Sequence, residues 1–318
     1  MTLYLDDAEV RRLLRLDALL EGMRRALVEF SAGQVVQPLR MAMEMPRVQG
    51  LLLLKPALTR DALATKLVTL VPGNPARGLP TILATVVLMD PETGRTLAVM
   101  DGTWITALRT AAVSAVAADA LAPREAAVVA MLGSGALART HALALRAVRP
   151  VREIRIWSRN PENVARCARE TGGIASPSAE QAVRGADIVC TVTNATEPVL
   201  RGAWLEPGAF VAAVGAPRPS WRELDDEAMA NIVVADSRES ALKESGDVIG
   251  SGATVYAELG EILGGTRPPP PRGRTVIFKS LGLAVEDAVA ARLVFEAALA
   301  ERAARTAQDG AQGGRRHD

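Results

Sequence analysis

The chain has 318 residues, of which 49% are hydrophobic and 23% charged, so it can bury a large core and divide into two domains. A formal net charge of +1 gives no reason to expect binding to nucleic acid or to an acidic membrane. The apolar runs are far shorter than a membrane span and the first residues are acidic, so we expect a cytoplasmic protein. Cys167, Cys190, His141 and His317 lack metal-ligand spacing, which predicts no metal site.

The first part of the chain predicts a helix followed by an antiparallel sheet. Apolar residues recur at helical spacing over 16–32, the pattern of an amphipathic helix that covers a sheet. Between residues 51 and 100 the runs are strand-like, and a turn at 90–94 with short spacing favours antiparallel pairing. Thr103 is then a candidate cap for a helix that runs toward Pro123. We therefore expect a smaller α+β domain over residues 1–120.

After Pro123 strands and helices alternate. Short apolar runs without strict alternation are separated by helix-length segments, as expected for parallel strands buried on both faces. The runs lie at 126–132, 153–157, 187–193, 209–215, 231–236 and 275–281. This pattern predicts an α/β fold, a doubly wound Rossmann-type domain over 121–282. A long helix over 283–306 is expected to join the first domain, and residues 307–318 are expected to be a disordered tail.

A glycine pair follows the first of these strands and opens a helix. Gly133 allows a tight turn, Gly135 lets the backbone approach a pyrophosphate, and Ala138 permits close packing of helix on strand. The helix N-terminus adds free N–H groups and a positive dipole end. The motif alone also fits a glycine turn without a ligand, but its strand-turn-helix context favours a dinucleotide site. The cofactor contacts expected here are Gly133, Ser134, Gly135, Ala136 and Leu137.

The end of the second strand favours NADPH over NADH. An NAD site usually carries an acid about 20 residues after the glycines, which would repel the 2′-phosphate of NADP. Here the strand ends in Ser158, Arg159 and Asn160, and the first acid is Glu162. Arg159 can pair with a phosphate and stack beside the adenine, although it could also be a solvated loop residue. Asn163 completes the candidate cofactor residues at this end.

Basic side chains in the first domain are candidates for substrate binding. Only four of the 37 basic residues are lysines, and Lys66 is one of them, in a mostly apolar strand. Arg40 precedes the strands, and Arg109 lies among small residues on the predicted helix. Each of the three could equally be a solvated charge or the partner of an acid.

Together these segments resemble the ornithine cyclodeaminase/mu-crystallin family over nearly the whole chain, excluding the tail. The resemblance is closest to the mu-crystallin branch, which is associated with NADPH-dependent ketimine reduction and, in vertebrates, with thyroid-hormone binding. The residues that carry it lie at 37–40, 65–69, 98–102, 109–115, 133–138, 196–198, 213–216, 221–226, 241–247 and 278–282.

The resemblance implies an architecture and a site. It implies a homodimer built through the first domain, with Arg40, Lys66 and Arg109 around the carboxylate of the substrate. It also implies that Lys279 lies near the same cleft, as a further substrate-binding residue. The nicotinamide half of the cofactor would lie beside a loop and a turn, whose residues are Thr193, Asn194, Ala195, Val214, Gly215 and Ala216.

One departure from the family separates its branches. Where ornithine cyclodeaminases carry an aspartate after the fifth strand and a carboxylate in the early sheet, this chain has Ala216 followed by Pro217, and Leu53 to Pro56. A cyclodeaminase must move protons to and from an amino group, so these losses favour simple imine reduction.

The resulting hypothesis is NADPH-dependent reduction of cyclic ketimine 2-carboxylates, the piperideine, pyrroline or sulfur-containing rings, to cyclic L-amino acids. Arg40 and Arg109 would bind the carboxylate, while Lys66 would donate the proton, hold the donating water, or only anchor the carboxylate. The alternatives are an ornithine cyclodeaminase, an alanine-type amino-acid dehydrogenase, and a non-catalytic protein that binds NADPH and a thyronine-like ligand.

Overall fold

The computed structural model describes residues 2–313, except for the side chains of Pro75 and of residues 309–313. Contacts divide the chain into two compact units. Unit 1 comprises Met1–Gly22, Val35–Thr106 and Ala284–Asp318, and unit 2 comprises Met23–Gln34 and Ala107–Leu283. The change of unit after Thr106 comes earlier than the boundary expected at residue 120, so most of the helix that begins at Thr103 belongs with unit 2.

Unit 1 contains a mixed sheet with the strand order β1-β6-β5-β4-β3-β2 among the residues described. The strands are β1 (Leu3–Leu5), β2 (Met41–Met45), β3 (Gly50–Leu58), β4 (Leu63–Leu70), β5 (Ile82–Met89) and β6 (Thr96–Asp101). Strands β2 to β6 pair in antiparallel fashion, which confirms the pairing predicted for the strands between residues 51 and 100. Strand β1 adds to the edge in parallel with β6, and neither β1 nor β2 was anticipated from the sequence.

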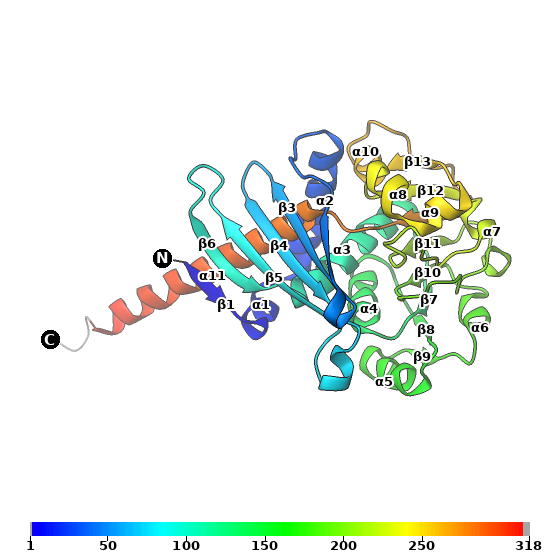
Figure 1. Ribbon diagram of the computed structural model, residues 1–318, viewed down its shortest axis with the longest axis horizontal. Helices are drawn as coiled ribbons and strands as arrows, with labels where there is room; N and C mark the ends of the chain where they lie inside the picture. The colour runs from blue at the N-terminus through cyan, green and yellow to red at the C-terminus, as the bar shows by residue number, and fades with distance from the viewer. Residues whose placement is uncertain (1, 314–318) are drawn as a thin grey trace. The chain divides into compact units, whose positions relative to one another are not determined.

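Helices border this sheet and cover one of its faces. Successive residues of each strand point alternately to the covered and to the uncovered face. The elements are α1 (Asp7–Leu13), the start of α2 (Leu16–Ser31), η1 (Pro46–Val48), η2 (Asn74–Arg77) and α11 (Ala284–Gly313). Helix α11 contacts β3, β4 and β5 from one side (Figure 1). On β4 the buried residues are Ala64, Lys66 and Val68, with partly exposed residues between them. This period of two places Lys66 on the face that α11 covers.

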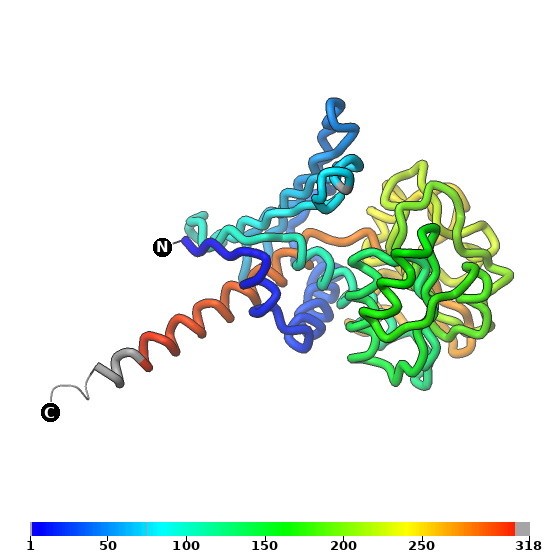
Figure 2. Tube along the Cα trace, turned by 90° about the horizontal axis from the view of Figure 1, so that it is seen from below, coloured from blue at the N-terminus to red at the C-terminus, as the bar shows by residue number. Residues whose placement is uncertain are grey.

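Helix α11 is longer than the sequence predicted. It was expected to end at residue 306 with a disordered tail from 307, but it continues to Gly313. Residues 302–308 are exposed, and Figure 2 shows the C-terminal part of the helix running beyond the strands of unit 1. The glycine-containing segment had favoured disorder by composition, whereas it continues the hydrogen-bonded turns of the preceding helix. Residues 314–318 lie outside the described part of the chain.

Unit 2 has a parallel sheet with the strand order β13-β12-β14-β11-β10-β7-β8-β9, so the prediction of a doubly wound α/β domain is confirmed. The strands are β7 (Val128–Leu132), β8 (Glu153–Trp157), β9 (Ile174–Ala175), β10 (Ile188–Thr191), β11 (Phe210–Ala213), β12 (Ile232–Ala235), β13 (Val255–Glu258) and β14 (Val276–Lys279). The short edge strands β9 and β13 had given no clear pattern. Strand order reverses at β7, which is flanked by β10 and β8.

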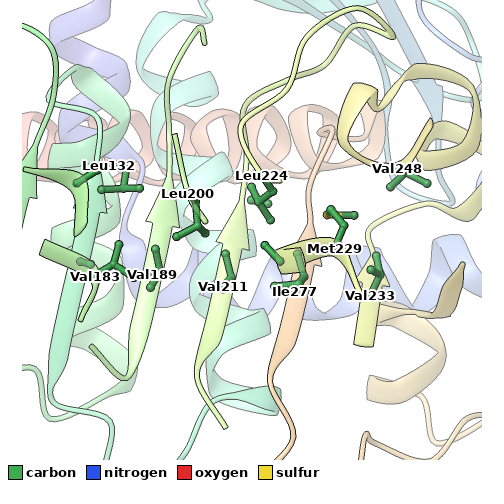
Figure 3. Packing of buried hydrophobic residues seen from close by; sticks show 14 of the residues in the cluster. Leu132, Val183, Val189, Leu200, Val211, Leu224, Met229, Val233, Val248 and Ile277 are labelled. Carbon is green, nitrogen blue, oxygen red and sulfur yellow. The ribbon is translucent and has the colours of Figure 1, made fainter. Parts of the chain in front are cut away.

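Helices connect these strands and enclose a core of aliphatic side chains. They are α3 (Thr103–Leu121), α4 (Ala136–Val148), α5 (Pro161–Thr171), α6 (Ala179–Val183), η3 (Gly202–Trp204), α7 (Asp226–Met229), α8 (Arg238–Glu244), α9 (Gly246–Ser251) and α10 (Leu259–Leu263). Figure 3 shows Val189, Val211 and Ile277 of neighbouring strands in one cluster with Leu132 and Leu224. Burial of these side chains stabilises the strands whose ends carry the candidate cofactor residues.

Helix α3 has the length and composition of a membrane span. Within its 19 residues, a segment of 18 has a mean hydropathy of 1.2, but 72% of that segment is buried inside the protein. Such burial is typical of a core helix that is apolar all round.

Candidate active site

The loop between β7 and α4 has the backbone that the glycine motif predicts. Gly133 has φ of 127°, a backbone conformation that residues with a side chain rarely adopt. A Cβ atom placed there would lie 2.7 Å from the carbonyl oxygen of Val192, which follows β10. Ala138, on the first turn of α4, is buried at 1% exposure. Gly133 and Ala138 therefore perform the turn and packing roles expected of them.

Gly135 faces open space and begins the helix. It is the N-cap residue of α4, with φ of −83°, and a Cβ atom added there would meet nothing within 4 Å. Having no side chain, Gly135 leaves the first N–H groups of α4 to an external acceptor. Ala136 and Leu137 form the first turn behind it. These features fit the pyrophosphate of a dinucleotide, for which a bare helix N-terminus is a suitable site.

The end of β8 lies beside this loop and is connected to it. The hydroxyl oxygens of Ser134 and Ser158 are 2.7 Å apart. Asn160 caps α5 by accepting a hydrogen bond from the backbone N–H of Asn163 at 3.0 Å. Arg159, between Ser158 and Asn160 in the sequence, is exposed. Arg166, one turn further along α5, donates to the side chain of Asn163 at 2.6 Å. Hydroxyl, amide and guanidinium groups thus surround the position where an NAD site would carry a carboxylate.

The candidate cofactor residues gather at one edge of the sheet. They follow the carboxyl ends of β7, β8, β10 and β11, four strands that are neighbours in the sheet. In open α/β sheets, ligands bind outside the carboxyl ends at the point where strand order reverses. The residues after β10 are Thr193, Asn194 and Ala195, and those after β11 are Val214, Gly215 and Ala216.

A carboxylate that the sequence analysis missed joins the loop after β10 to the turn after β11. Glu223 is fully buried and accepts hydrogen bonds from the Thr191 hydroxyl at 2.7 Å and from the Gly215 N–H at 2.8 Å. It also accepts from the N–H and hydroxyl of Thr193, each at 2.6 Å. Burial raises the pKa of the Glu223 carboxyl, while Lys279 and the threonine contacts act in the opposite direction.

Lys279, which was expected near the substrate cleft, is enclosed by protein groups in the structure. Its side chain is fully buried, and its ammonium group donates to Asp247 Oδ2 at 2.8 Å and to the Gly215 carbonyl oxygen. Asp247 in turn accepts the backbone N–H groups of Glu223 and Leu224. The ammonium group is therefore enclosed and bound by protein acceptors, and the expected contact of Lys279 with the substrate stays a prediction. A desolvated cation requires such partners.

His141 connects the cofactor helix to α3. Its Nδ1 donates to the carbonyl oxygen of Leu137 at 2.7 Å, and its Nε2 accepts from the Ser114 hydroxyl at 3.0 Å. Burial lowers the pKa of His141 to about 4, so the imidazole is neutral at physiological pH. This histidine is a satisfied core residue that anchors α4.

In unit 1, Lys66 is buried at 1% exposure in the middle of β4. Its ammonium group donates to Asp287 Oδ1 at 2.7 Å and to the Thr106 hydroxyl oxygen at 3.1 Å. The Thr106 hydroxyl donates a hydrogen bond to the carbonyl oxygen of Gly102 at 2.7 Å, so its oxygen acts as an acceptor toward Lys66. The carboxylate and the hydroxyl together direct the ammonium group.

Two further cations belong to the same part of unit 1. Lys55 is directly opposite Lys66 in the pairing of β3 with β4, is buried at 6% exposure, and lies 3.7 Å from Asp287 Oδ2. Arg40 precedes β2, whose first residue Met41 pairs with Leu54, the neighbour of Lys55. The register therefore brings the backbone of Arg40, Lys55 and Lys66 to successive strands.

Arg109 lies in unit 2 on α3, with 5% exposure. Its guanidinium packs on the Cα atom of Gly282, where an added Cβ atom would lie 2.5 Å from Nη1. Gly282 has φ of 77°, and Asp236 Oδ2 accepts its backbone N–H at 2.7 Å and that of Leu281 at 2.6 Å. The turn after β14 is thus shaped to receive the arginine.

Sequence reasoning missed three acids that organise these groups, namely Glu223, Asp247 and Asp287. Two of them had a signal that could have been used. Asp287 follows Glu286 in the first turn of a long apolar helix, and both are buried. Asp247 lies next to Gly246 in a segment already noted for its resemblance to the family. Glu223 also lies in such a segment, 221–226, but Asp225 and Asp226 beside it gave no reason to choose Glu223 among the three acids.

Comparison with known proteins agrees with this geometry. The family model described as "Ornithine cyclodeaminase/mu-crystallin family" matches residues 2–302. The chain is 48% identical over 287 residues to ketimine reductase mu-crystallin of Macropus fuliginosus. This match covers 87% of this chain and 91% of that protein.

Solved structures of similar proteins share the whole fold. One is the Δ1-pyrroline-2-carboxylate reductase of Thermococcus litoralis in complex with NADH and L-proline, with a TM-score of 0.90 and 36% identity over 94% of this chain and 98% of that one. Another is a dimer of an archaeal alanine dehydrogenase with bound NAD, with a TM-score of 0.89 and 32% identity over 95% and 97% of the two chains. The match along the chain and the preserved fold show that this protein belongs to the ornithine cyclodeaminase/mu-crystallin family.

Proposed function

We propose that this protein reduces cyclic ketimine 2-carboxylates to cyclic L-amino acids with NADPH as the hydride donor. One hydride adds to the carbon of the C=N bond and one proton adds to its nitrogen, which leaves the saturated ring and NADP⁺. Relatives whose names state ketimine and pyrroline-2-carboxylate reduction support this reaction class. The bound cofactor supplies the hydride, and the protein supplies position and charge.

The observation that carries the proposal is the buried ammonium group of Lys66, held by Asp287 at 2.7 Å. Imine reduction requires a proton at nitrogen, and a lysine fixed by a carboxylate is a group that can hold and orient one. A lysine whose only task is solubility would be exposed. We therefore assign Lys66 as proton donor or as holder of the donating water, with carboxylate anchoring as its alternative role.

Arg109 and Arg40 are proposed to bind the substrate carboxylate. The planar guanidinium group matches a carboxylate in bidentate geometry, which would fix the orientation of the ring. The support from the structure is local: Arg109 is buried against a turn built around Gly282. Arg40 precedes the strand that pairs with β3, next to Lys55 in the register.

A preference for NADPH over NADH is proposed from the end of β8. The hydroxyl of Ser158 is engaged by Ser134, and Arg159 is exposed beside them, where a 2′-phosphate would add negative charge. The guanidinium group would pair with that phosphate. The similar structures named above contain NADH and NAD, so the proposed preference of this protein for NADPH rests on Ser158 and Arg159 alone.

A homodimer built through unit 1 is proposed from the uncovered face of its sheet. Met41, Met43, Leu58 and Leu83 are apolar and between 37% and 63% exposed. The register Met41↔Leu54 and Leu54↔Leu67 shows that partly exposed leucines continue this face across β3 and β4. A contiguous apolar face of this kind marks an interaction surface, and the archaeal alanine dehydrogenase named above is a dimer.

A cytoplasmic location is proposed from the unpaired cysteines Cys167 and Cys190.

The test is NADPH oxidation with a panel of substrates. The panel contains cyclic ketimine carboxylates of five- and six-membered rings, pyruvate with ammonia, and ornithine. We expect turnover with the ketimines, and at least a 100-fold loss in Lys66→Met and Arg109→Leu. Lys243→Met and Arg152→Leu make the same chemical changes at exposed positions and should retain activity.

Other outcomes would point to the other functions. Turnover with pyruvate and ammonia but not with ketimines would indicate an amino-acid dehydrogenase, and ammonia release from ornithine would indicate a cyclodeaminase. Binding of NADPH with no turnover of any substrate would leave the non-catalytic alternative. Ketimine turnover unaffected by Lys66→Met and Arg109→Leu would refute the assigned site.

A further inference from the structure

Three buried charged side chains meet at the carboxyl ends of β11 and β14. Glu223, Asp247 and Lys279 each have 0% exposure, and we call them the buried triad. The triad is built from segments that follow β11, begin α9 and end β14. So many desolvated charges in one place are costly unless each one is bound. Their contacts show what they hold in place.

Glu223 is bound through both carboxylate oxygens. Oε1 accepts from the backbone N–H and hydroxyl of Thr193, and Oε2 accepts from the backbone N–H of Gly215 and the hydroxyl of Thr191. Each oxygen therefore accepts one backbone N–H, and the two N–H groups come from different loops. The carboxylate fixes the distance between the loop after β10 and the turn after β11.

Lys279 binds the other side of the same turn. Its ammonium group donates to the carbonyl oxygen of Gly215, whose N–H is bound by Glu223. Asp247 balances this cation at 2.8 Å and also accepts the backbone N–H of Glu223 at 2.8 Å. The peptide groups on both sides of the Gly215 Cα atom are thus held by buried charges.

The turn itself has a strained backbone. Ala216 has φ of 53°, a left-handed conformation that is unfavourable for a residue with a Cβ atom, and it is fully buried. A side chain at Gly215 would collide with the carboxyl group of Glu223. Such strain persists where the surroundings over-determine the backbone, and it is common at ligand sites.

We propose that Glu223 and Lys279 are positioning residues that hold Thr193 and the turn 214–216 in the shape that receives the nicotinamide ring. They act through the backbone of Gly215 and through Thr193, since their own charged groups are enclosed. This inference rests on the proposed function, which puts the nicotinamide half of the cofactor at these loops. The adenine half lies at β7 and β8, whose loops make no described contact with the triad.

The test separates the two halves of the cofactor. Each carboxylate oxygen of Glu223 accepts one backbone N–H. In Glu223→Gln an NH₂ group replaces one of these oxygens, so two hydrogen-bond donors face each other there. In Lys279→Met, the Gly215 carbonyl oxygen and Asp247 lose their donor. Glu239→Gln and Lys243→Met make the same changes in an exposed ion pair on α8 and are the matched controls.

For each variant, the affinities for 2′-phospho-ADP-ribose and for NADPH are measured, together with the single-turnover rate of hydride transfer to a cyclic ketimine. We expect Glu223→Gln and Lys279→Met to keep the affinity for 2′-phospho-ADP-ribose within about 3-fold. Hydride transfer should slow by roughly 10- to 100-fold, because a small misplacement of the ring has effects of that size. The controls should match the wild type.

Equal losses for 2′-phospho-ADP-ribose and NADPH would overturn the inference, since they would indicate general loosening of unit 2. Wild-type rates in both variants would also overturn it. If either variant fails to fold, Thr191→Val, which removes one hydroxyl donor to Glu223 at a buried strand position, should show the same selective loss on a smaller scale. If the wild-type protein binds NADPH but reduces no ketimine, the proposed function is refuted. The inference is then decided by whether Glu223→Gln and Lys279→Met weaken binding of NADPH more than binding of 2′-phospho-ADP-ribose.

Discussion

Lys66 Nζ and Asp287 Oδ1 lie 2.7 Å apart although 221 positions of sequence separate the two residues. The contact joins the middle of β4 to the first turn of α11, and both side chains are almost fully buried. It is the reason that a lysine can occupy an apolar strand. It also brings a carboxylate to the early sheet, where the sequence between Leu53 and Pro56 contains none.

Removing this carboxylate tests what it does for Lys66. We expect Asp287→Asn to lower kcat for a cyclic ketimine by roughly 100-fold, because the ammonium group loses the partner that orients it. NADPH affinity should stay within about 3-fold, since the cofactor loops belong to unit 2. Asp61→Asn, at an exposed position of unit 1, is the control. Steady-state kinetics and cofactor titration check both values, and unchanged kcat in Asp287→Asn would contradict the role given to Lys66.

The two glycines of the cofactor loop should respond differently to alanine. Gly133→Ala introduces a Cβ atom at φ of 127°, against the Val192 carbonyl, and should lower the free energy of unfolding by at least ~1–2 kcal/mol. Gly135→Ala places a methyl group in open space at an ordinary φ, so stability should change by less than ~1 kcal/mol.

Cofactor affinity gives the complementary result. The Gly135 methyl group would occupy the space assigned to the pyrophosphate, and we expect NADPH affinity to fall by roughly 10-fold or more at nearly unchanged stability. Denaturant unfolding and cofactor titration are measured on the same samples. Tight NADPH binding by Gly135→Ala would mean that the pyrophosphate lies elsewhere.

Arg159 decides the preference for NADPH in this interpretation. Arg159→Ala removes a charge-assisted hydrogen bond worth ~1.5–3 kcal/mol, so NADPH affinity should fall by roughly 10- to 100-fold. NADH affinity should change by less than about 3-fold, because NADH has no 2′-phosphate. Arg152→Ala, exposed just before β8, changes the same charge at the opposite end of the strand and serves as control. A parallel loss of affinity for both dinucleotides would show that Arg159 does not read the 2′-phosphate.

His141 makes the stability of the protein depend on pH. Its pKa is lowered by burial to about 4 in the folded state, against 6.5 for the exposed residue. Between pH 6.5 and about 4 the unfolded chain therefore binds a proton that the folded chain does not, and stability falls as pH decreases through this window. The contribution is at most ~3.5 kcal/mol at ~1.4 kcal/mol per pKa unit.

The variant His141→Gln isolates this contribution. It should be less stable than the wild type at pH 7, because the contacts with Leu137 and Ser114 are altered. It should also lose less stability than the wild type when the pH is lowered from 7 to 4.5. Urea unfolding at several pH values measures both quantities, and parallel pH curves for the two proteins would exclude His141 as the source.

The uncovered face of the sheet in unit 1 predicts the oligomeric state. Met43→Glu puts a charge in the proposed dimer interface at a side chain that is 51% exposed in the single chain. We expect the monomer to fold, with Tm changed little, and the dimer to dissociate, because an unpaired buried charge is costly at an interface. Leu242→Glu, at a 53% exposed residue of α8 in unit 2, is the control. Sedimentation of both variants checks the prediction, and a wild-type protein that sediments as a monomer would exclude the dimer.

Local sequence determined much of this protein. The strand-turn-helix at Gly133 and Gly135, and the polar end of β8, could be recognised directly because their function depends on backbone geometry and side-chain type within a few residues. The apolar runs predicted the central strands of both sheets for the same reason. Short edge strands such as β1 and β9 escaped, since their few residues carry too little periodicity to be distinguished.

Only the tertiary structure decided which charged groups meet. Lys66 and Lys279 looked alike in sequence, each a lysine in an apolar strand, yet Lys66 is held by a carboxylate from α11 and Lys279 is enclosed by Asp247 and the Gly215 carbonyl. The partner of a buried charge comes from chain folding over long separations, which neither hydrophobic periodicity nor motif spacing records. The same holds for Glu223, whose acceptor role depends on two loops that the parallel sheet brings side by side.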